Sequence, residues 1–328
     1  MKTASKAVPT TMRASAIDRF GPPSVLKIHE LPVPRVGARE VLIAVDTAGV
    51  GTWEPEQRSG AWGAEGVRFP LVLGSDGSGT VVARGAQVRR FRVGDRVYGY
   101  NFGGTKGGFY AEYVAVGASK VARLPRGLDL LHAGASPAVA LTALQGIEAL
   151  GVKRNERVVV TGASGNVGMF ALQFAKARGA HVLAIASGRD GSAFARRLGA
   201  DAAVDGKRGN VAEALSRFAP DGVDAVLGLV GGKVLTACTD ALRRMGRVAY
   251  PNGIDPEPRK RRGLKLVAYD AKTGVKELAR LNRATEKARL IVPIARLFRL
   301  EQAAQAHRRV SKGHLLGRVV LRVARRRK

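Results

Sequence analysis

The spacing of hydrophobic and polar residues changes partway along the chain. Residues 12–125 form short apolar segments broken by Gly, Pro and Asp, such as VLIAVDTAGV and RVGDRVYGY. Turn signals at this density predict a compact β-rich domain. From Leu130 apolar residues recur at helical spacing, and from Arg157 strand-like runs alternate with helix-like runs. The alternation predicts parallel β-α-β units in a doubly wound sheet, so the expected fold class is α/β.

These patterns predict an organisation in four segments. A length of 328 residues is typical of about two domains. We expect a disordered leader over 1–11, the β-rich domain over 12–129, the doubly wound domain over 130–290, and a C-terminal segment over 291–328. Within the doubly wound domain, ACTDALRRMG (237–246) is expected to be a helix. The C-terminal segment has an apolar strand, a short helix, a final strand and a basic tail, and we expect it to rejoin the first domain.

One stretch, VVVTGASGNVGMFALQFAKARGA (158–180), combines an apolar strand, a glycine-rich turn and a helix. Glycines at such spacing let the chain turn tightly, let backbone N–H groups approach a diphosphate, and let the helix pack closely on the strand. The positive end of the helix completes the anion site. The stretch therefore predicts dinucleotide binding by the turn residues Gly162, Ser164, Gly165, Asn166, Val167 and Gly168.

The end of the next strand bears on which cofactor is bound. An NAD site usually has an acidic residue there, which accepts hydrogen bonds from the ribose 2′-hydroxyl, whereas a 2′-phosphate needs a cation and small donors. The chain has Ser187, Gly188, Arg189 and Asp190 at this point. Ser187 and Arg189 favour NADPH. The alternative is that Asp190 reads the ribose and that Arg189 is only a solvated side chain.

Cysteine and histidine usage argues against a metal site. Cys238 is the only cysteine, which excludes an intrachain disulfide and is typical of a reducing compartment. The five histidines are scattered and form no ligand pair of known spacing. We expect no bound metal. The N-terminus has no apolar segment typical of a secretory signal and the chain has no run long enough to span a bilayer, so a cytosolic protein is expected.

The net charge of +29 suggests nucleic acid or anionic membranes as alternative partners. Much of the excess charge lies in Arg259–Lys265 and in the tail Ala324–Lys328. Neither segment has the interleaved aromatic residues of a single-strand binding surface, so solvated charge is the simpler interpretation. We expect neither nucleic-acid nor membrane binding.

Several motifs, in their order and spacing, resemble the medium-chain dehydrogenase/reductase superfamily, and in particular its zinc-free quinone oxidoreductases related to zeta-crystallin. They include GSDGSGTV (74–81), VGDRVYG (93–99), TALQG (142–146), TGASGNVG (161–168) and LEQAAQAHRRVSKGHLLGRVVL (300–321). The resemblance covers the chain from Met12 onward. It implies a GroES-like catalytic domain, built from the N-terminal part and the C-terminal segment, around a Rossmann domain, and it implies a homodimer.

The resemblance also implies site residues. Thr142 resembles the threonine beside the nicotinamide, although a hydroxyl that caps or stabilises its own helix is an equal alternative. The cofactor is expected to run along two segments, Val230-Gly231-Gly232 and Pro251-Asn252-Gly253, which could otherwise be simple turns. Zinc-dependent relatives have a histidine in the segment matched here by Gly74-Ser75-Asp76, so hydride transfer is expected to proceed without zinc.

The acceptor pocket departs from the family pattern. Gly51 and Thr52 stand where Asn-Pro is usual, and Glu56 stands where a tyrosine is usual. Trp53, Glu54 and Tyr100 are therefore candidate catalytic or pocket residues. Trp53 could equally be a packing aromatic, and Tyr98, Tyr100 and Tyr110 could all be structural.

Three functions are compatible with these observations. The leading hypothesis is a metal-free NADPH-dependent reductase of a quinone or an α,β-unsaturated carbonyl. A second is an NADP-linked dehydrogenase of another small alcohol or carbonyl. A third, from a different class, is a cofactor-sensing or RNA-binding protein that keeps the fold.

Overall fold

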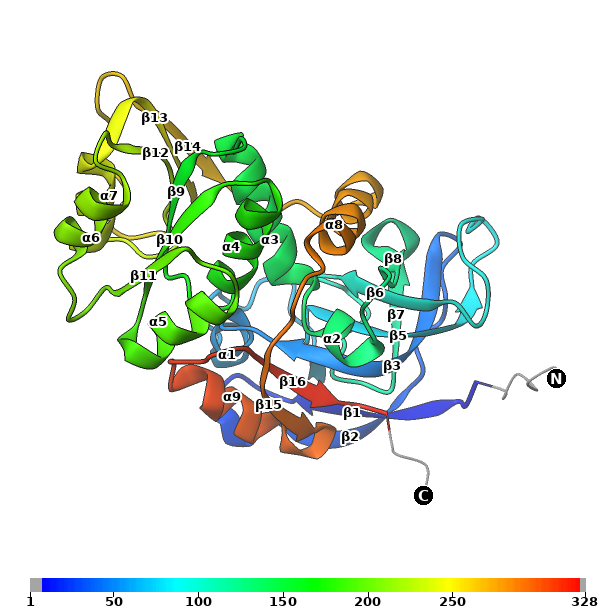
Figure 1. Cartoon of the computed structure of the whole chain (residues 1–328). Helices are drawn as coiled ribbons and strands as arrows, with labels where there is room; N and C mark the ends of the chain where they lie inside the picture. Colours follow the sequence, from blue (N-terminus) through cyan, green and yellow to red (C-terminus); the bar gives the residue numbers. More distant parts are fainter. Residues whose placement is uncertain (1–7, 325–328) are drawn as a thin grey trace.

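The computed structural model of the chain describes residues 8–324 and has two main sheets, each covered by helices (Figure 1). The strands are β1 (Thr11–Ile17), β2 (Lys27–Pro32), β3 (Glu40–Val50), β4 (Leu71–Val72), β5 (Asp76–Arg84), β6 (Arg96–Tyr100), β7 (Tyr113–Gly117), β8 (Val121–Arg123), β9 (Arg157–Thr161), β10 (His181–Ala186), β11 (Ala202–Asp205), β12 (Val223–Leu227), β13 (Leu242–Pro251), β14 (Lys265–Tyr269), β15 (Ile294–Arg299) and β16 (Arg318–Arg322). The helices are α1 (Trp53–Ser59), α2 (Leu130–Gly134), α3 (Pro137–Leu150), α4 (Gly168–Ala177), α5 (Gly188–Arg197), α6 (Val211–Phe218), α7 (Lys233–Asp240), α8 (Val275–Ala288) and α9 (Ala303–Ser311), with short 3-10 turns at Pro23–Val25, Ala118–Lys120 and Leu300–Gln302.

The α/β part is a parallel sheet in the order β11-β10-β9-β12-β13-β14. Every neighbouring pair in it is parallel. The alternating side chains of β9 face opposite layers: Val158 and Val160 pack with α3 and α4, whereas Val159 packs with α6 and α7. The strand order reverses between β9 and β12, which is the switch point where doubly wound sheets bind ligands. The predicted α/β class and Rossmann topology are confirmed.

The β-rich part is a sheet in the order β15-β16-β3-β5-β6-β8, with β7 also on β3, beside a small sheet β2-β1-β4. Strand β16 pairs antiparallel with β3, from Val319 opposite Val50 to Arg322 opposite Thr47. The last strand of the chain thus lies beside one of the first (Figure 1). Because of this return, residues from near the end of the chain can reach a site formed by residues from its first half.

Two expectations for secondary structure need correction. Thr11, placed in the leader, belongs to β1, because it pairs with Pro32 on β2; residues 1–7 of that leader lie outside the described part. The helix expected over 237–246 is wrong, because α7 already ends at Asp240 and β13 begins at Leu242. The register of β13 against β12 shifts between Val223 and Ala225, so the pairing jumps from Leu242 to Arg247 on β13.

Two further expectations concern the tail and the membrane. Most of the basic tail, residues 325–328, lies outside the described part of the chain. Within residues 8–324, no helix combines the length and the apolar composition needed to cross a bilayer.

Candidate functional site

The glycine-rich turn joins β9 to α4 at the carboxyl edge of the parallel sheet. Gly162 has a φ of +64°, in the left-handed region that glycine adopts without strain. A Cβ on Gly168 would lie 2.2 Å from the carbonyl oxygen of Gly162, so only glycine lets α4 begin this close to the turn. The turn therefore presents backbone and a helix N-terminus, the surface that suits a diphosphate.

Thr161 connects this turn to the loop after β12. Its hydroxyl accepts hydrogen bonds from the backbone N–H groups of Leu229 (2.9 Å) and Val230 (3.1 Å). Val230 is thereby held beside the turn, so that a Cβ on Gly162 would lie 2.8 Å from the Val230 side chain. Thr161 thus positions the loop after β12. The sequence analysis included it in the glycine-rich motif but predicted no role for its hydroxyl.

A cavity of about 660 Å³ follows this edge of the sheet and extends to the β-rich part. Its volume is within the usual range for small-molecule sites. Residues that the sequence singled out line much of it: Trp53, Gly162, Ser164, Gly165, Asn166, Val167, Gly168, Ser187 and Val230. Thr52, from the expected acceptor pocket, and Pro251, from the second segment expected along the cofactor, line it as well. The remaining lining residues were not foreseen as site residues: Val139, Ile185, Ala186, Gly206, Lys207, Leu229, Val234, Lys312, Gly313, His314 and Leu315.

Several of the residues expected to bind the cofactor lie outside this lining. Arg189 is exposed in the first turn of α5. The side-chain amide of Asn252 donates to the Asp270 carboxylate (2.7 Å). Gly231 packs against another loop, since a Cβ there would lie 2.7 Å from the carbonyl oxygen of Asp255. Their roles at the cofactor stay predictions.

One end of the cavity is cationic. Lys207 and Lys312 line it, the first just after β11 and the second just after α9. The Asp205 carboxylate accepts hydrogen bonds from the backbone N–H groups of Gly188 and Lys207, both at 3.0 Å, and these bonds lower the pKa of Asp205. Asp205 therefore orders the loops after β10 and β11 together. Lys207 and Lys312 escaped the sequence analysis because they follow elements far from the glycine turn in sequence.

The opposite end of the cavity contains Trp53, at the start of α1. Its indole Nε1 donates to the Ser75 hydroxyl at 2.9 Å. The ring also covers Gly51, where a Cβ would lie 2.5 Å from the indole. Trp53 and Val139, from α3, form the apolar wall here.

Glu54 is fully buried and lies outside the cavity lining. One carboxylate oxygen accepts from the Gly51 N–H (2.7 Å) and the other from the Ser75 N–H (3.0 Å). Burial, and after it the nearby Asp76 carboxylate, raises the pKa of Glu54, both backbone bonds and Arg318 oppose the rise, and the net result is a pKa of about 7. Glu54 therefore acts on Trp53 indirectly, by joining the two backbone segments that the indole contacts.

Asp76 and Arg318 form a buried ionic pair behind this wall. Asp76 Oδ2 lies 3.8 Å from Arg318 Nη2 and accepts from the backbone N–H of Ala138 (3.1 Å). Arg318 Nε donates to the carbonyl of Ala135 (2.6 Å). Burial raises the pKa of Asp76, and the guanidinium opposes that rise. The pair connects β5 and β16 to the start of α3, which carries Val139.

The other candidate hydroxyl groups have structural partners or lie outside the cavity lining. Thr142 Oγ1 donates to the carbonyl of Ala138 (2.9 Å), one turn earlier in the same helix. Tyr98 donates to Asn282 (2.7 Å), and the Tyr110 hydroxyl lies 3.3 Å from His307 Nε2. Tyr100 is half-buried against the apolar core. Burial is the main cause that raises the pKa of its hydroxyl, and the negative charges of Asp76 and Glu54 add to the rise.

The segment that matches the zinc-binding position of zinc-dependent relatives does not suit a metal in this chain. Ser75 stands where zinc-dependent relatives have a histidine, and its hydroxyl accepts from the Trp53 indole. Over residues 8–324, no three His, Cys, Asp or Glu side chains lie close enough together to hold a metal ion. The donors at this position therefore do not fit zinc, and a zinc-free mechanism stays a prediction.

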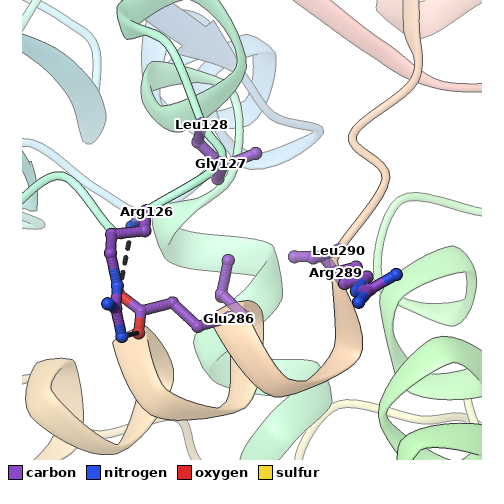
Figure 2. Close-up of a pocket in the computed structure, with 7 residues that line it drawn as sticks. Arg126, Gly127, Leu128, Glu286, Arg289 and Leu290 are labelled. Atoms are coloured by element: carbon purple, nitrogen blue, oxygen red, sulfur yellow. Dashed lines mark hydrogen bonds and ion pairs between the residues drawn. The ribbon is translucent and has the colours of Figure 1, made fainter.

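A separate hollow of about 390 Å³ lies between α8 and the loop before α2 (Figure 2). The Glu286 carboxylate accepts from both the backbone N–H (3.0 Å) and the guanidinium (3.2 Å) of Arg126 across it. These bonds attach α8 to the β-rich part. The hollow is therefore a structural junction between these two parts, and none of its lining residues lines the cavity at the glycine turn.

Comparisons with known proteins agree with this architecture. Residues 37–126 match the family described as "Alcohol dehydrogenase GroES-like domain", and residues 198–321 match the one described as "Zinc-binding dehydrogenase". The quinone oxidoreductase of Mus musculus is 30% identical over 319 residues, which cover 92% of this chain and 95% of that protein. The mitochondrial NAD(P)H oxidoreductase RTN4IP1 of Bos taurus is 36% identical over 268 residues, which cover 75% of this chain but only 66% of that protein.

Solved structures are similar over nearly the whole chain. The quinone oxidoreductase of Coxiella burnetii has a TM-score of 0.85 at 30% identity and covers 96% of this chain and 100% of its own. A mycobacterial protein complexed with NADPH has a TM-score of 0.81 at 27% identity, with 95% and 100% coverage. The β-rich part is thus a GroES-like domain, as expected.

Proposed function

The chain belongs to the quinone oxidoreductase-like branch of the medium-chain dehydrogenase/reductase superfamily, and from this premise we propose that it transfers hydride from NADPH to a quinone or an α,β-unsaturated carbonyl. The observation that carries the proposal is a single cavity that joins the glycine turn to an apolar wall. At one end lie the backbone of Gly162–Gly168 and the cations Lys207 and Lys312, and at the other lie Trp53 and Val139.

Residues of this chain suit each part of a nicotinamide dinucleotide. The Gly162–Gly168 turn would hold the diphosphate through backbone N–H groups, and Val230 would line the path toward the nicotinamide. When bound, the reduced nicotinamide supplies the hydride. Trp53 and Val139 exclude water from that end of the cavity, and the buried pair Asp76–Arg318 fixes the start of the helix that carries Val139.

A conjugated acceptor suits a site without a Lewis acid. In a quinone or an enone, the charge that develops on reduction spreads over the conjugated system, which lessens the need for a metal. The side chains at the apolar end include no histidine or carboxylate that could act as a base toward a simple alcohol. We propose that water delivers the final proton, since Tyr100 lies outside the cavity lining.

Preference for NADPH is proposed from the cationic end of the cavity. Lys207 and Lys312 line it, Ser187 supplies a small donor, and Arg189 lies in the next helical turn. A charge-assisted hydrogen bond contributes about 1.5–3 kcal/mol, or roughly 10- to 100-fold in affinity. Lys207→Ala should therefore weaken NADPH binding at least tenfold and change NADH binding less than about twofold.

A parallel Arg189→Ala variant tests the residue that the sequence favoured. Titration of cofactor fluorescence gives both dissociation constants for each variant. If Lys207→Ala and Arg189→Ala leave the ratio of NADPH to NADH affinity unchanged, a 2′-phosphate site at this end is excluded.

The acceptor is tested by stopped-flow mixing with NADPH and a panel of quinones, enones and aldehydes. Oxidation of NADPH by quinones or enones, with little by aldehydes, is expected. The replacement of Asn-Pro by Gly51-Thr52, with Trp53 over Gly51, keeps a second candidate open. That candidate is an NADP-linked dehydrogenase of another small carbonyl, and turnover with aldehydes alone would favour it. Cofactor binding without any turnover, together with salt-sensitive RNA binding, would instead favour a sensing protein.

A further inference from the structure

The turn between α9 and β16 connects the end of the chain to the cofactor-binding part. Lys312, Gly313, His314 and Leu315 all line the cavity. The His314 Nε2 atom lies 2.8 Å from Oδ2 of Asp190, in the first turn of α5. A side chain from a segment that pairs with the β-rich sheet thus contacts the helix that follows the second strand of the Rossmann sheet.

The backbone holds His314 in this position. His314 has a φ of +46°, in the left-handed region that non-glycine residues rarely adopt. The Arg309 guanidinium donates to the carbonyls of both Gly313 (2.9 Å) and His314 (3.2 Å). A Cβ added to Gly188 would lie 3.5 Å from the imidazole, which shows how closely the ring approaches the start of α5. Both side chains are about half exposed, and only His314 lines the cavity, so the contact holds Asp190 at the rim of the cavity.

The partner, Asp190, is the acidic side chain that could read an unphosphorylated ribose. A carboxylate in this region favours NAD by accepting from the 2′-hydroxyl and repels a 2′-phosphate. Both of its oxygens are engaged, since Oδ2 lies against His314 and Oδ1 accepts from the backbone N–H of Gly191 (2.8 Å). These bonds, His314 first, lower the pKa of Asp190 and keep it ionised. Without the imidazole, the Oδ2 atom of this carboxylate would be free to turn toward a ribose bound beside Ser187 and Gly188.

We propose that His314 is a specificity-determining residue, which selects NADPH by holding the Asp190 carboxylate away from the ribose. The role rests on the proposed function, because it presumes a nicotinamide dinucleotide in the cavity. With this role, the choice between NADPH and NADH depends on a residue near the end of the chain. That residue lies outside the segment β9–turn–α4, which is proposed to bind the diphosphate. The imidazole keeps the carboxylate turned away from a bound 2′-phosphate, and Lys207 and Lys312 in the cavity lining supply the attraction.

The test is a mutant cycle on the full chain. His314→Gln should lower the ratio of NADPH to NADH affinity about tenfold, because the released carboxylate repels the 2′-phosphate and accepts from the 2′-hydroxyl. Asp190→Asn should leave the ratio within about twofold of wild type. The double variant should restore it, because no carboxylate remains to be held. Dissociation constants for both nucleotides are measured by cofactor fluorescence.

A matched control separates specificity from stability. His132 forms a similar pair, at 2.7 Å, with Asp129 at the start of α2, and neither residue lines the cavity. His132→Gln should leave the affinity ratio unchanged. Equal weakening of both nucleotides by His314→Gln, or a double variant that fails to restore the ratio, overturns the proposal for His314. A wild-type protein that binds neither nucleotide would overturn the proposed function itself.

Discussion

The indole Nε1 of Trp53 donates a 2.9 Å hydrogen bond to the hydroxyl of Ser75, across the position where zinc-dependent relatives have a metal ligand. The same indole covers Gly51 and forms part of the cavity wall. An aromatic side chain thus fills space at the end of the cavity where we propose that the acceptor binds. Its orientation depends on Ser75 and on Glu54, which joins the backbone of Gly51 to that of Ser75.

Trp53→Phe should raise the KM for the acceptor several-fold and change the dissociation constant of NADPH by less than about twofold. Phenylalanine retains an aromatic ring but loses the bond that orients it. Ser75→Ala removes the other partner and should have the same effect. If the bond positions the ring, the two substitutions together cost no more than either alone, with a coupling of about 1 kcal/mol. Fully additive effects would contradict the positioning role.

Glu54 should make stability fall as pH rises. Its pKa in the folded protein, about 7, is above the ordinary value of 4.5. Between these values the folded state binds more protons than the unfolded state, so the free energy of unfolding decreases by up to about 3 kcal/mol from pH 4.5 to above pH 7. In Glu54→Gln this part of the decrease should vanish, as measured by urea unfolding at pH 5 and pH 8. The exposed Glu56 supplies the control: Glu56→Gln should keep the wild-type slope.

Two glycines of the turn should differ in their roles: Gly168 should matter for the stability of the fold, and Gly165 for cofactor binding. In Gly168→Ala the new Cβ would lie 2.2 Å from the Gly162 carbonyl oxygen and 2.6 Å from the Ala163 Cα, both rigid backbone atoms. We expect a loss of about 1–3 kcal/mol in the free energy of unfolding. At Gly165 the nearest atom to a new Cβ is the Gly162 carbonyl oxygen, 3.1 Å away, so the loss of stability should be smaller than at Gly168. Because Gly165 lines the cavity, Gly165→Ala should instead weaken cofactor binding about tenfold. Equal affinities for the two variants and wild type would exclude the turn as the diphosphate site.

Chelation should leave the activity intact. Ser75 cannot replace a histidine ligand while it accepts from Trp53, and no other suitable group of ligands lies within residues 8–324. Dialysis against a chelator should therefore leave more than about nine-tenths of the rate, while a zinc-dependent alcohol dehydrogenase treated in parallel loses its activity. Complete loss of activity, restored by added zinc, would show that a metal is required.

A homodimer and a cytosolic location stay predictions. Sedimentation at several protein concentrations tests the first, and fractionation of cells tests the second.

Local pattern determined much of this protein. The alternation of strand-like and helix-like runs from Arg157 onward predicts the parallel sheet. It can do so because the spacing of apolar residues and the turn residues between them are set within a few neighbouring positions of the sequence. The glycine turn is similarly local: its residues adjoin one another in sequence, and their small size is needed where α4 begins against β9. These features could be identified without knowledge of any distant contact.

Only the tertiary structure decided which side chains share the cavity with that turn. Lys207 lines the cavity with Ser187 because β11 pairs with β10, so the loops after both strands leave the same edge of the sheet. His314 lines it because β16 returns to β3 and brings its preceding turn with it. Glu54 is one residue from Trp53, but only folding shows that it faces the buried backbone while Trp53 faces the cavity. Burial and long-range contact depend on how separate elements pack, and a single sequence does not encode that packing in any local pattern.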